Sequence, residues 1–166
     1  MIFFNNRIYR AFFLFGFSGR RKGEVISLKW ENIDLNNNYY WLETTKNNES
    51  QKFPLSPMIK TALLEFTNKR GLVFKSPITG KQLQNTDRQM RKLKQVTQIP
   101  ELSYHYMRNV LVSTLAEQDT EAIILSGVLG HKDVNTINKY LSLNYYQSGL
   151  KAGNIVNNLI DVEMVE

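Results

Sequence analysis

The spacing of apolar residues along the chain predicts a domain built mainly from helices. In most of the sequence, apolar positions recur at intervals of three and four, the repeat of a helix with one buried face. Glycine, proline and small polar residues separate these stretches and indicate where helices begin and end. The predicted helices cover roughly residues 1–17, 24–30, 57–66, 85–96, 104–118 and 120–129, and one more follows Asp133.

One part of the chain has the pattern of β-strands instead. Tyr39 to Thr45 is aromatic and rich in residues that favour strands, Lys46 to Glu49 resembles a turn, and Gln51 to Leu55 is a short extended run. These features predict a β-hairpin with Lys46 at its tip. The expected fold class is therefore α+β, mainly α with a small antiparallel β-hairpin or sheet.

Local signals place several boundaries. Ser56 followed by Pro57 is a typical helix start, and Gly130 stands where a left-handed residue ends a helix. Between these points we expect a short strand over Leu72 to Phe74 and a turn over Pro77 to Gly80.

Two helices carry charged groups beside a packing face. In the helix over 85–96, Met90 and Leu93 are expected to point inward, and the other face carries Arg88, Arg91, Lys92 and Lys94. In the helix over 104–118, His105 and Arg108 are three residues apart and should be neighbours on the helix surface. The predicted core-facing residues of that helix are Met107, Leu111, Thr114 and Leu115.

Composition narrows the possible functions. The 166 residues are 42% hydrophobic, enough for one domain, residues 1–166, with its own core. The chain has no cysteine and two histidines, so we expect no disulfide, no metal site and no cofactor. The net charge of +6 favours a polyanion as partner. The apolar start, interrupted at Asn5 to Arg7 and at Arg10, is shorter than the roughly 20 residues of a membrane span, and we expect a cytoplasmic protein.

Several polar residues together have the chemistry needed for phosphoryl transfer. Such a reaction requires positive charge at the phosphate, a nucleophile in line and an acid for the leaving oxygen. Each candidate also has a purely structural explanation: Arg21 as a solvated surface residue, His131 as a cation near a helix end, and Tyr140 as a core aromatic. The candidates are Arg21, Lys46, His105, Arg108, His131 and Tyr140.

These residues occur in motifs that resemble the tyrosine recombinases, or phage integrase family. The stretch Ser18 to Glu24 is similar to the motif Thr-Gly-x-Arg-x-x-Glu, with Arg21 at the arginine position. His105 to Arg108 resembles the His-x-Leu-Arg box. Leu129-Gly130-His131 resembles the Leu-Gly-His box, and Tyr140, nine residues later, resembles the nucleophile box. Lys46, eight residues before Pro54, matches the hairpin lysine. The similarity runs from about Phe12 to Tyr140, and five motifs in the right order are a specific signal.

The sequence departs from the family pattern at several positions. Ser18 replaces threonine and keeps the hydroxyl, while Met107 replaces leucine at similar volume. Asn109 stands where many relatives have a second histidine, and Asn32 where aspartate is common, which affects local hydrogen bonding more than chemistry. Relatives also carry a helical DNA-clamping domain before this one, so we expect the chain to be a fragment or a truncated product.

The resemblance implies a tyrosine-recombinase catalytic-domain fold and a metal-independent cleavage of DNA. Tyr140 would attack a phosphodiester to form a 3′-phosphotyrosyl bond. Arg21 and Arg108 would hold the non-bridging oxygens, and Lys46 would protonate the leaving 5′-oxygen. His105 would serve as acid and base, and His131 would hydrogen-bond the phosphate.

The same resemblance suggests partners. The expected partner is double-stranded DNA, with backbone phosphates contacted by Arg20, Lys75, Lys81, Arg88, Arg91 and Lys92. The tail from Tyr145 to Glu166 would dock on a neighbouring subunit in a tetramer on DNA, or on its own domain in a monomer. Two alternatives stay open: an enzyme similar to type IB topoisomerases, and a non-catalytic DNA-binding remnant of an integrase.

Overall fold

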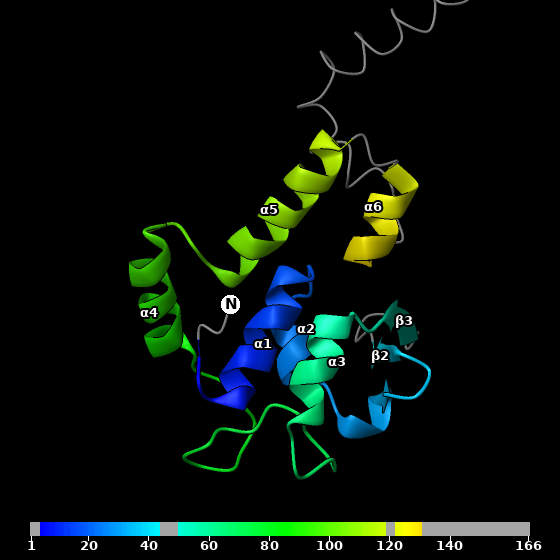
Figure 1. Cartoon of the computed structure of the whole chain (residues 1–166), viewed down its shortest axis with the longest axis vertical. Coiled ribbons are helices and arrows are strands. Elements are labelled where there is room, and N and C mark those ends of the chain that lie inside the picture. The colour runs from blue at the N-terminus through cyan, green and yellow to red at the C-terminus, as the bar shows by residue number, and fades with distance from the viewer. Residues whose placement is uncertain (1–3, 44–49, 119–121, 131–166) are drawn as a thin grey trace, which may run out of the picture. The chain divides into compact units, whose positions relative to one another are not determined.

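The computed structural model describes residues 4–43, 50–118 and 122–130, which fall into two compact units, Met1–Leu111 and Val112–Glu166. The elements follow one another as drawn in Figure 1. They are α1 (Arg7–Phe17), α2 (Lys22–Ile26), the 3₁₀ turn η1 (Trp30–Asn32), β1 (Ile33–Asp34), β2 (Tyr39–Glu43), β3 (Ser50–Pro54), α3 (Pro57–Leu64), α4 (Asp87–Thr97), α5 (Tyr104–Glu117) and α6 (Ala122–Leu129). The expected class, mainly α with a small antiparallel sheet, is confirmed.

Helix α1 is the central helix of the first unit. Asn6 caps its start, because its side-chain oxygen accepts the N–H of Ile8 at 2.9 Å. The apolar face predicted from the sequence is buried and includes Phe12, Phe13 and Phe15. The helix ends at Phe17, as the sequence predicts.

The sheet has the order β1-β2-β3 with antiparallel neighbours. Tyr40 pairs with Phe53 and Trp41 pairs with Lys52, which confirms the predicted hairpin. Because side chains alternate along a strand, Tyr40 and Phe53 both face the core. Lys46 at the expected tip lies outside the described residues.

The segment between the sheet and α4 agrees with the sequence only in part. Helix α3 begins after Ser56, whose hydroxyl accepts the N–H of Ile59 at 3.4 Å. The strand expected over Leu72 to Phe74 is wrong, since this segment forms only an isolated bridge to Lys29. Lys29, the partner in this bridge, does not belong to a strand, so the pairing does not continue as a β-ladder. The turn over Pro77 to Gly80 is confirmed and closes with a Gly80 N–H to Ser76 carbonyl bond of 2.9 Å.

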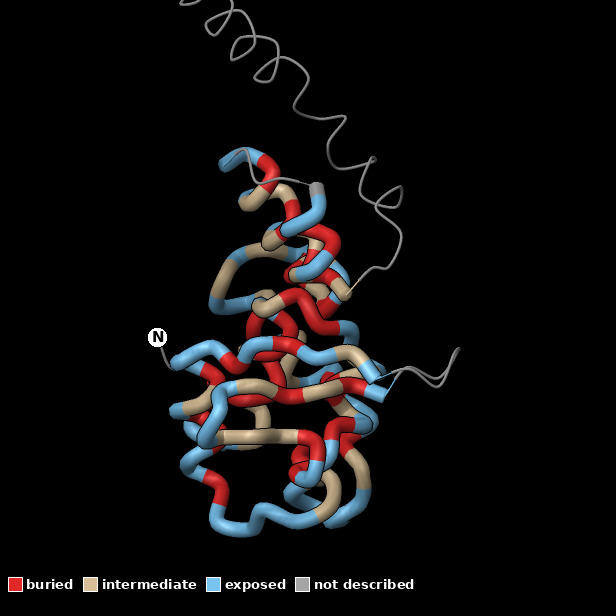
Figure 2. The backbone as a smooth tube through the Cα atoms, turned by 90° about the vertical axis from the view of Figure 1, so that its right-hand side faces the viewer, coloured by how far each residue is buried: buried red, intermediate tan, exposed pale blue. Residues whose placement is uncertain are grey.

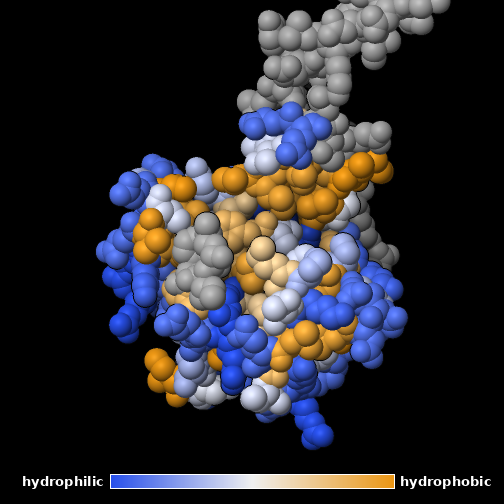
Figure 3. Space-filling view, in the orientation of Figure 1, coloured by the Kyte–Doolittle hydropathy of each residue, from blue (hydrophilic) through white to orange (hydrophobic). Residues whose placement is uncertain are grey.

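Helix α4 has the predicted two faces. Leu93 is buried and Met90 is half-buried against the core, while Arg88, Arg91 and Lys92 are exposed. In the space-filling view the surface around α4 is largely hydrophilic (Figure 3). A left-handed residue, Gln98, with φ of 56°, ends the helix.

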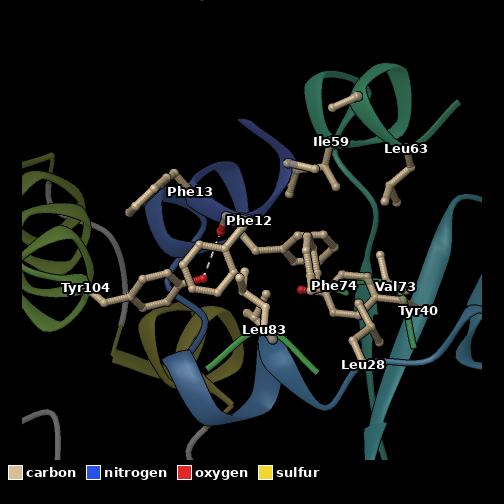
Figure 4. Packing of buried hydrophobic residues seen from close by; sticks show 14 of the residues in the cluster. Phe12, Phe13, Leu28, Tyr40, Ile59, Leu63, Val73, Phe74, Leu83 and Tyr104 are labelled. Carbon is tan, nitrogen blue, oxygen red and sulfur yellow. Dashed lines mark hydrogen bonds between the residues drawn. The ribbon is translucent and has the colours of Figure 1, made fainter. Parts of the chain in front are cut away.

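Aromatic rings make up much of the core of the first unit, where buried and exposed positions alternate along the chain (Figure 2). Phe12 lies against Tyr104 and Phe74, at ring-centroid distances of 4.9 and 5.7 Å (Figure 4). Phe15 contacts Tyr40 edge to face at 5.2 Å. Edge-to-face and tilted rings at such distances contribute beyond simple burial. This core joins α1, the sheet and the start of α5.

Helices α5 and α6 follow the predicted ranges closely. Met107 is buried as expected, but Thr114 is exposed, so this part of the predicted packing face is wrong. The buried positions beyond residue 111 are instead Val112 and Ala116. Helix α6 buries Leu125 and Leu129 and ends at Gly130, whose φ of 65° confirms the predicted left-handed stop. Among the described residues, no helix is both long and apolar enough to cross a membrane.

Candidate active site

The candidate site is built around the turn between α1 and α2, residues 18–21, here called the arginine turn. Gly19 has a φ of 84°, a left-handed conformation that suits glycine. Its N–H donates to the carbonyl of Gly16 at 3.0 Å, and the N–H of Arg20 donates to the carbonyl of Phe15 at 3.1 Å. These two bonds form a Schellman motif, so the main chain fixes where the next arginines begin.

Arg21 is the N-cap residue of α2, and its side chain is exposed. The carboxylate of Glu24 accepts hydrogen bonds from the Arg21 backbone N–H and from its guanidinium, both at 2.8 Å. An exposed ion pair of this kind stabilises little. The ion pair instead orients Arg21, because the Glu24 carboxylate holds the guanidinium beside the turn while leaving it open to solvent.

Arg108 reaches the same turn from α5. Its side chain is only 5% exposed, and its guanidinium donates a hydrogen bond to the carbonyl of Gly19. Arg108 is therefore anchored on the same short turn in which Arg21 stands, although the two residues are far apart in the sequence.

Close packing of α5 on α1 makes this anchoring possible. The Tyr104 hydroxyl donates to the carbonyl of Phe12 at 3.0 Å inside the core. Burial raises the pKa of Tyr104 well above its ordinary value, so this phenol stays protonated and remains a donor. Gly16 allows the approach, since a Cβ there would lie 3.0 Å from the Tyr104 ring and 3.1 Å from the sulfur of Met107.

The sequence reasoning did not single out Gly16 or Tyr104. A glycine inside an apolar helix is a known sign of close backbone approach, so Gly16 could have been noticed. The partner of Tyr104 could not, because nothing local connects it to α1.

Of the other predicted catalytic residues, the structure describes His105. His105 lies in the first turn of α5 with an exposed side chain, next to the anchored Tyr104. The expectation that His105 and Arg108 share the helix surface holds for His105 alone, because Arg108 is buried. Lys46, His131 and Tyr140 lie outside the described residues.

Arg20 is not where the sequence led us to expect it. As a DNA-contacting residue it should be on the surface, yet it is only 3% exposed. Its guanidinium carbon lies 3.8 Å from the centroid of the Phe53 ring, a cation–π contact that draws the side chain inward. A direct contact with DNA phosphates is at odds with this position.

The remaining predicted DNA contacts lie on or near α4. Arg88, Arg91, Lys92 and Lys81 are exposed. Lys75 is half-buried, and its ammonium donates to the carbonyl of Arg70 at 3.3 Å. Lys81, Arg88 and Arg91 also line an open cavity of about 610 Å³ together with Tyr9. Within the described ranges, no three histidine or carboxylate side chains come together in a way that could hold a metal ion.

Comparison with known proteins shows the family of the chain. The chain matches the phage integrase family over residues 5–147. It is 29% identical to the shufflon-specific DNA recombinase of Escherichia coli over 86% of this chain and 36% of that protein. It is 28% identical to tyrosine recombinase XerA of Saccharolobus solfataricus over 76% of this chain and 42% of that protein. The chain thus spans less than half the length of these relatives.

Solved structures show the same fold. XerA recombinase superposes with a TM-score of 0.66 at 18% identity, covering 92% of this chain and 57% of that one. XerH recombinase bound to a palindromic difH substrate, in a post-cleavage complex, gives 0.69 at 21% identity, with coverage of 92% and 46%. The Tn1549 transposon integrase with transposon right end DNA gives 0.70 at 13% identity, with coverage of 91% and 59%.

Proposed function

Because this chain belongs to the phage integrase family, we propose that it cleaves and rejoins DNA as the catalytic part of a site-specific tyrosine recombinase. One observation carries the proposal: the Arg108 guanidinium is anchored on the Gly19 carbonyl, beside Arg21. A turn that gathers two guanidiniums is suited to bind a phosphodiester and to stabilise the added charge of its transition state.

In the proposed reaction the Tyr140 oxygen attacks the scissile phosphorus and the 5′-oxygen of the next nucleotide leaves. A 3′-phosphotyrosyl bond forms as the P–O5′ bond breaks, so the bond energy is kept for rejoining. Lys46 would donate the proton that the leaving oxygen needs, and His105 would take the proton of the phenol. His131 would donate a hydrogen bond to the phosphate. All of these roles use side chains of this chain.

Double-stranded DNA is the proposed substrate. The exposed cations on α4, Arg88, Arg91 and Lys92, would contact backbone phosphates on either side of the cleavage point. Relatives of the same fold include recombinases and integrases in complex with DNA, which supports this partner. The cytoplasm is the proposed compartment for this reaction.

Assembly is a further part of the proposal. The tail from Tyr145 to Glu166 would dock on a neighbouring protomer, giving a tetramer on DNA and a monomer off it. Sedimentation with and without DNA would test this, and a tail protected from protease in a free monomer would contradict exchange.

The test of the proposed chemistry is covalent trapping. A DNA duplex with a nick close to the cleavage point loses a short strand after attack, so the protein–DNA adduct accumulates. The intact chain should form this adduct, and Tyr140→Phe should abolish it because only the attacking oxygen is missing. An adduct that persists in Tyr140→Phe would assign the nucleophile to Tyr145 or Tyr146. Salt-dependent DNA binding without any adduct would refute the enzymatic function.

A further inference from the structure

Hydrogen bonds do not explain why Arg20 is buried. Its side chain is 3% exposed, and its Nε and Nη1 atoms are buried without a hydrogen-bond partner among the described residues. Loss of solvent lowers the pKa of Arg20, but a guanidinium stays protonated at neutral pH. A fixed positive charge is therefore held in the interior at a considerable energetic cost.

A chain of aromatic contacts holds this charge in place. The guanidinium carbon lies 3.8 Å from the Phe53 ring centroid, and Phe53 stacks on Tyr40 at 5.6 Å. Tyr40 in turn meets the ring of Phe15 edge to face at 5.2 Å. The carbonyl of Phe15 accepts the backbone N–H of Arg20, so the contacts return to the residue where they began. The position of the Arg20 charge is thus fixed at both its backbone and its head group.

This charge lies next to the proposed phosphate site. Along the chain, Arg20 stands between Gly19, whose carbonyl anchors Arg108, and Arg21. Besides burial, Tyr40 and Glu24 raise the pKa of Arg20 and Arg21 lowers it, so Arg20 interacts electrostatically with charges at the turn. Glu24 pairs with Arg21, and Arg108 is bonded to the Gly19 carbonyl of the same turn. A buried charge is weakly screened and acts over a longer distance than a surface one.

We propose that Arg20 is a positioning residue of the phosphate site, whose buried guanidinium, stacked on Phe53, adds to the positive field that Arg21 and Arg108 present to a phosphodiester. It acts without touching the phosphate. A nonpolar side chain of the same length would fill the space at a lower free-energy cost of burial. The presence of a charge at this position therefore argues for a functional role. This inference rests on the proposed function, because the phosphate is that of the DNA.

The experiment separates charge from shape. Arg20→Met keeps an unbranched side chain that can pack on Phe53, and Arg20→Lys keeps the charge. Arg70→Met is the matched control, because it removes one exposed cation outside the site. The readouts are the single-turnover rate of adduct formation at saturating nicked DNA and the midpoint of thermal unfolding.

We expect Arg20→Met to unfold at the same or a higher temperature while its cleavage rate falls on the order of tenfold, less than the loss of a donor that touches the phosphate. Arg20→Lys should recover most of the rate, and Arg70→Met should retain it. Cleavage by Arg20→Met at the wild-type rate would overturn the inference. So would a loss of rate that accompanies a lower unfolding midpoint and is not recovered by lysine, because that pattern means a packing role alone.

A second readout is independent of catalysis. Inorganic phosphate should raise the unfolding midpoint of the wild-type chain more than that of Arg20→Met, and equal increases would contradict the inference. If the wild-type chain forms no adduct, the proposed chemistry fails by itself. The phosphate measurement still decides whether the Arg20 charge serves an anion site.

Discussion

Replacing Gly16 with alanine should strain the contact that brings α5 onto α1. The added Cβ would lie 3.0 Å from two ring carbons of Tyr104 and 3.1 Å from the sulfur of Met107. Carbon atoms in contact prefer about 3.5–4.0 Å, so the ring must retreat by about 0.5 Å. Overpacking of this kind costs about 1–3 kcal/mol, and the better helix propensity of alanine offsets about 1 kcal/mol of it. The free energy of unfolding should therefore fall by up to about 2 kcal/mol.

Gly23→Ala provides a matched control. Gly23 is also helical, but a Cβ there would meet no atom within 4 Å. This substitution should raise the free energy of unfolding by up to about 1 kcal/mol through helix propensity alone. The difference between the two variants then isolates the packing penalty at residue 16, about 1–3 kcal/mol.

Urea unfolding followed by tryptophan fluorescence measures this difference directly. Both tryptophans of the chain, Trp30 and Trp41, lie in the first unit and report its unfolding. Because the displaced ring adjoins His105 and precedes Arg108 by one helical turn, Gly16→Ala should also slow adduct formation. If Gly16→Ala were as stable as Gly23→Ala, the close approach of α1 and α5 would not be what positions Arg108.

Three further predictions follow from other contacts. Arg108→Lys keeps the charge but loses the planar guanidinium that is held on Gly19. It should slow adduct formation by about 10²–10³ fold in single-turnover assays, and a loss under tenfold would contradict the role of Arg108 at the phosphate. Burial raises the pKa of Tyr40 to about 12, above the ordinary value of 10, so the neutral phenol is favoured on folding. The contribution of Tyr40 to stability should be constant below pH 10 and fall between pH 10 and 12 by about 1.4 kcal/mol per pH unit, and Tyr40→Phe should remove this part of the slope in urea titrations. Replacing Arg88, Arg91 and Lys92 together with glutamine should reduce the slope of log affinity for DNA against log salt by about 3, and an unchanged slope would place DNA elsewhere.

Local sequence signals predicted the β-hairpin, most of the helices and the start of the arginine turn. The single helix expected over 24–30 is instead α2, which ends at Ile26, and the separate turn η1. The β-hairpin follows from strand propensity around Tyr40 and Phe53, and the end of α1 follows from Ser18-Gly19. These features depend on neighbouring residues, which a single sequence displays. The isolated bridge at Leu72 shows the limit, because a strand also needs a partner that the sequence does not identify.

The site was predictable in its residue types and less so in its burial. Arg108 is anchored on the Gly19 carbonyl, in the turn that carries Arg21, and their joint role at a phosphate stays a prediction. Arg20 was expected on the surface because arginine usually is, and its inward turn depends on Phe53, a residue distant in sequence. Tertiary contacts of this kind decide which of two adjacent arginines faces solvent.

The acceptor that anchors Arg108 is a main-chain oxygen, and this affects how its importance can be measured. Every amino acid at residue 19 supplies the same oxygen, so alanine scanning would report only the strain of the φ of 84°. An ester in place of the amide between Gly19 and Arg20 weakens that oxygen as an acceptor but also deletes the Arg20 N–H. An ester between Ser18 and Gly19 is a useful comparison, because it deletes the Gly19 N–H and weakens the Ser18 carbonyl but leaves the Gly19 carbonyl an amide oxygen. Backbone chemistry, rather than side-chain mutagenesis, is the direct probe of how this chain holds Arg108.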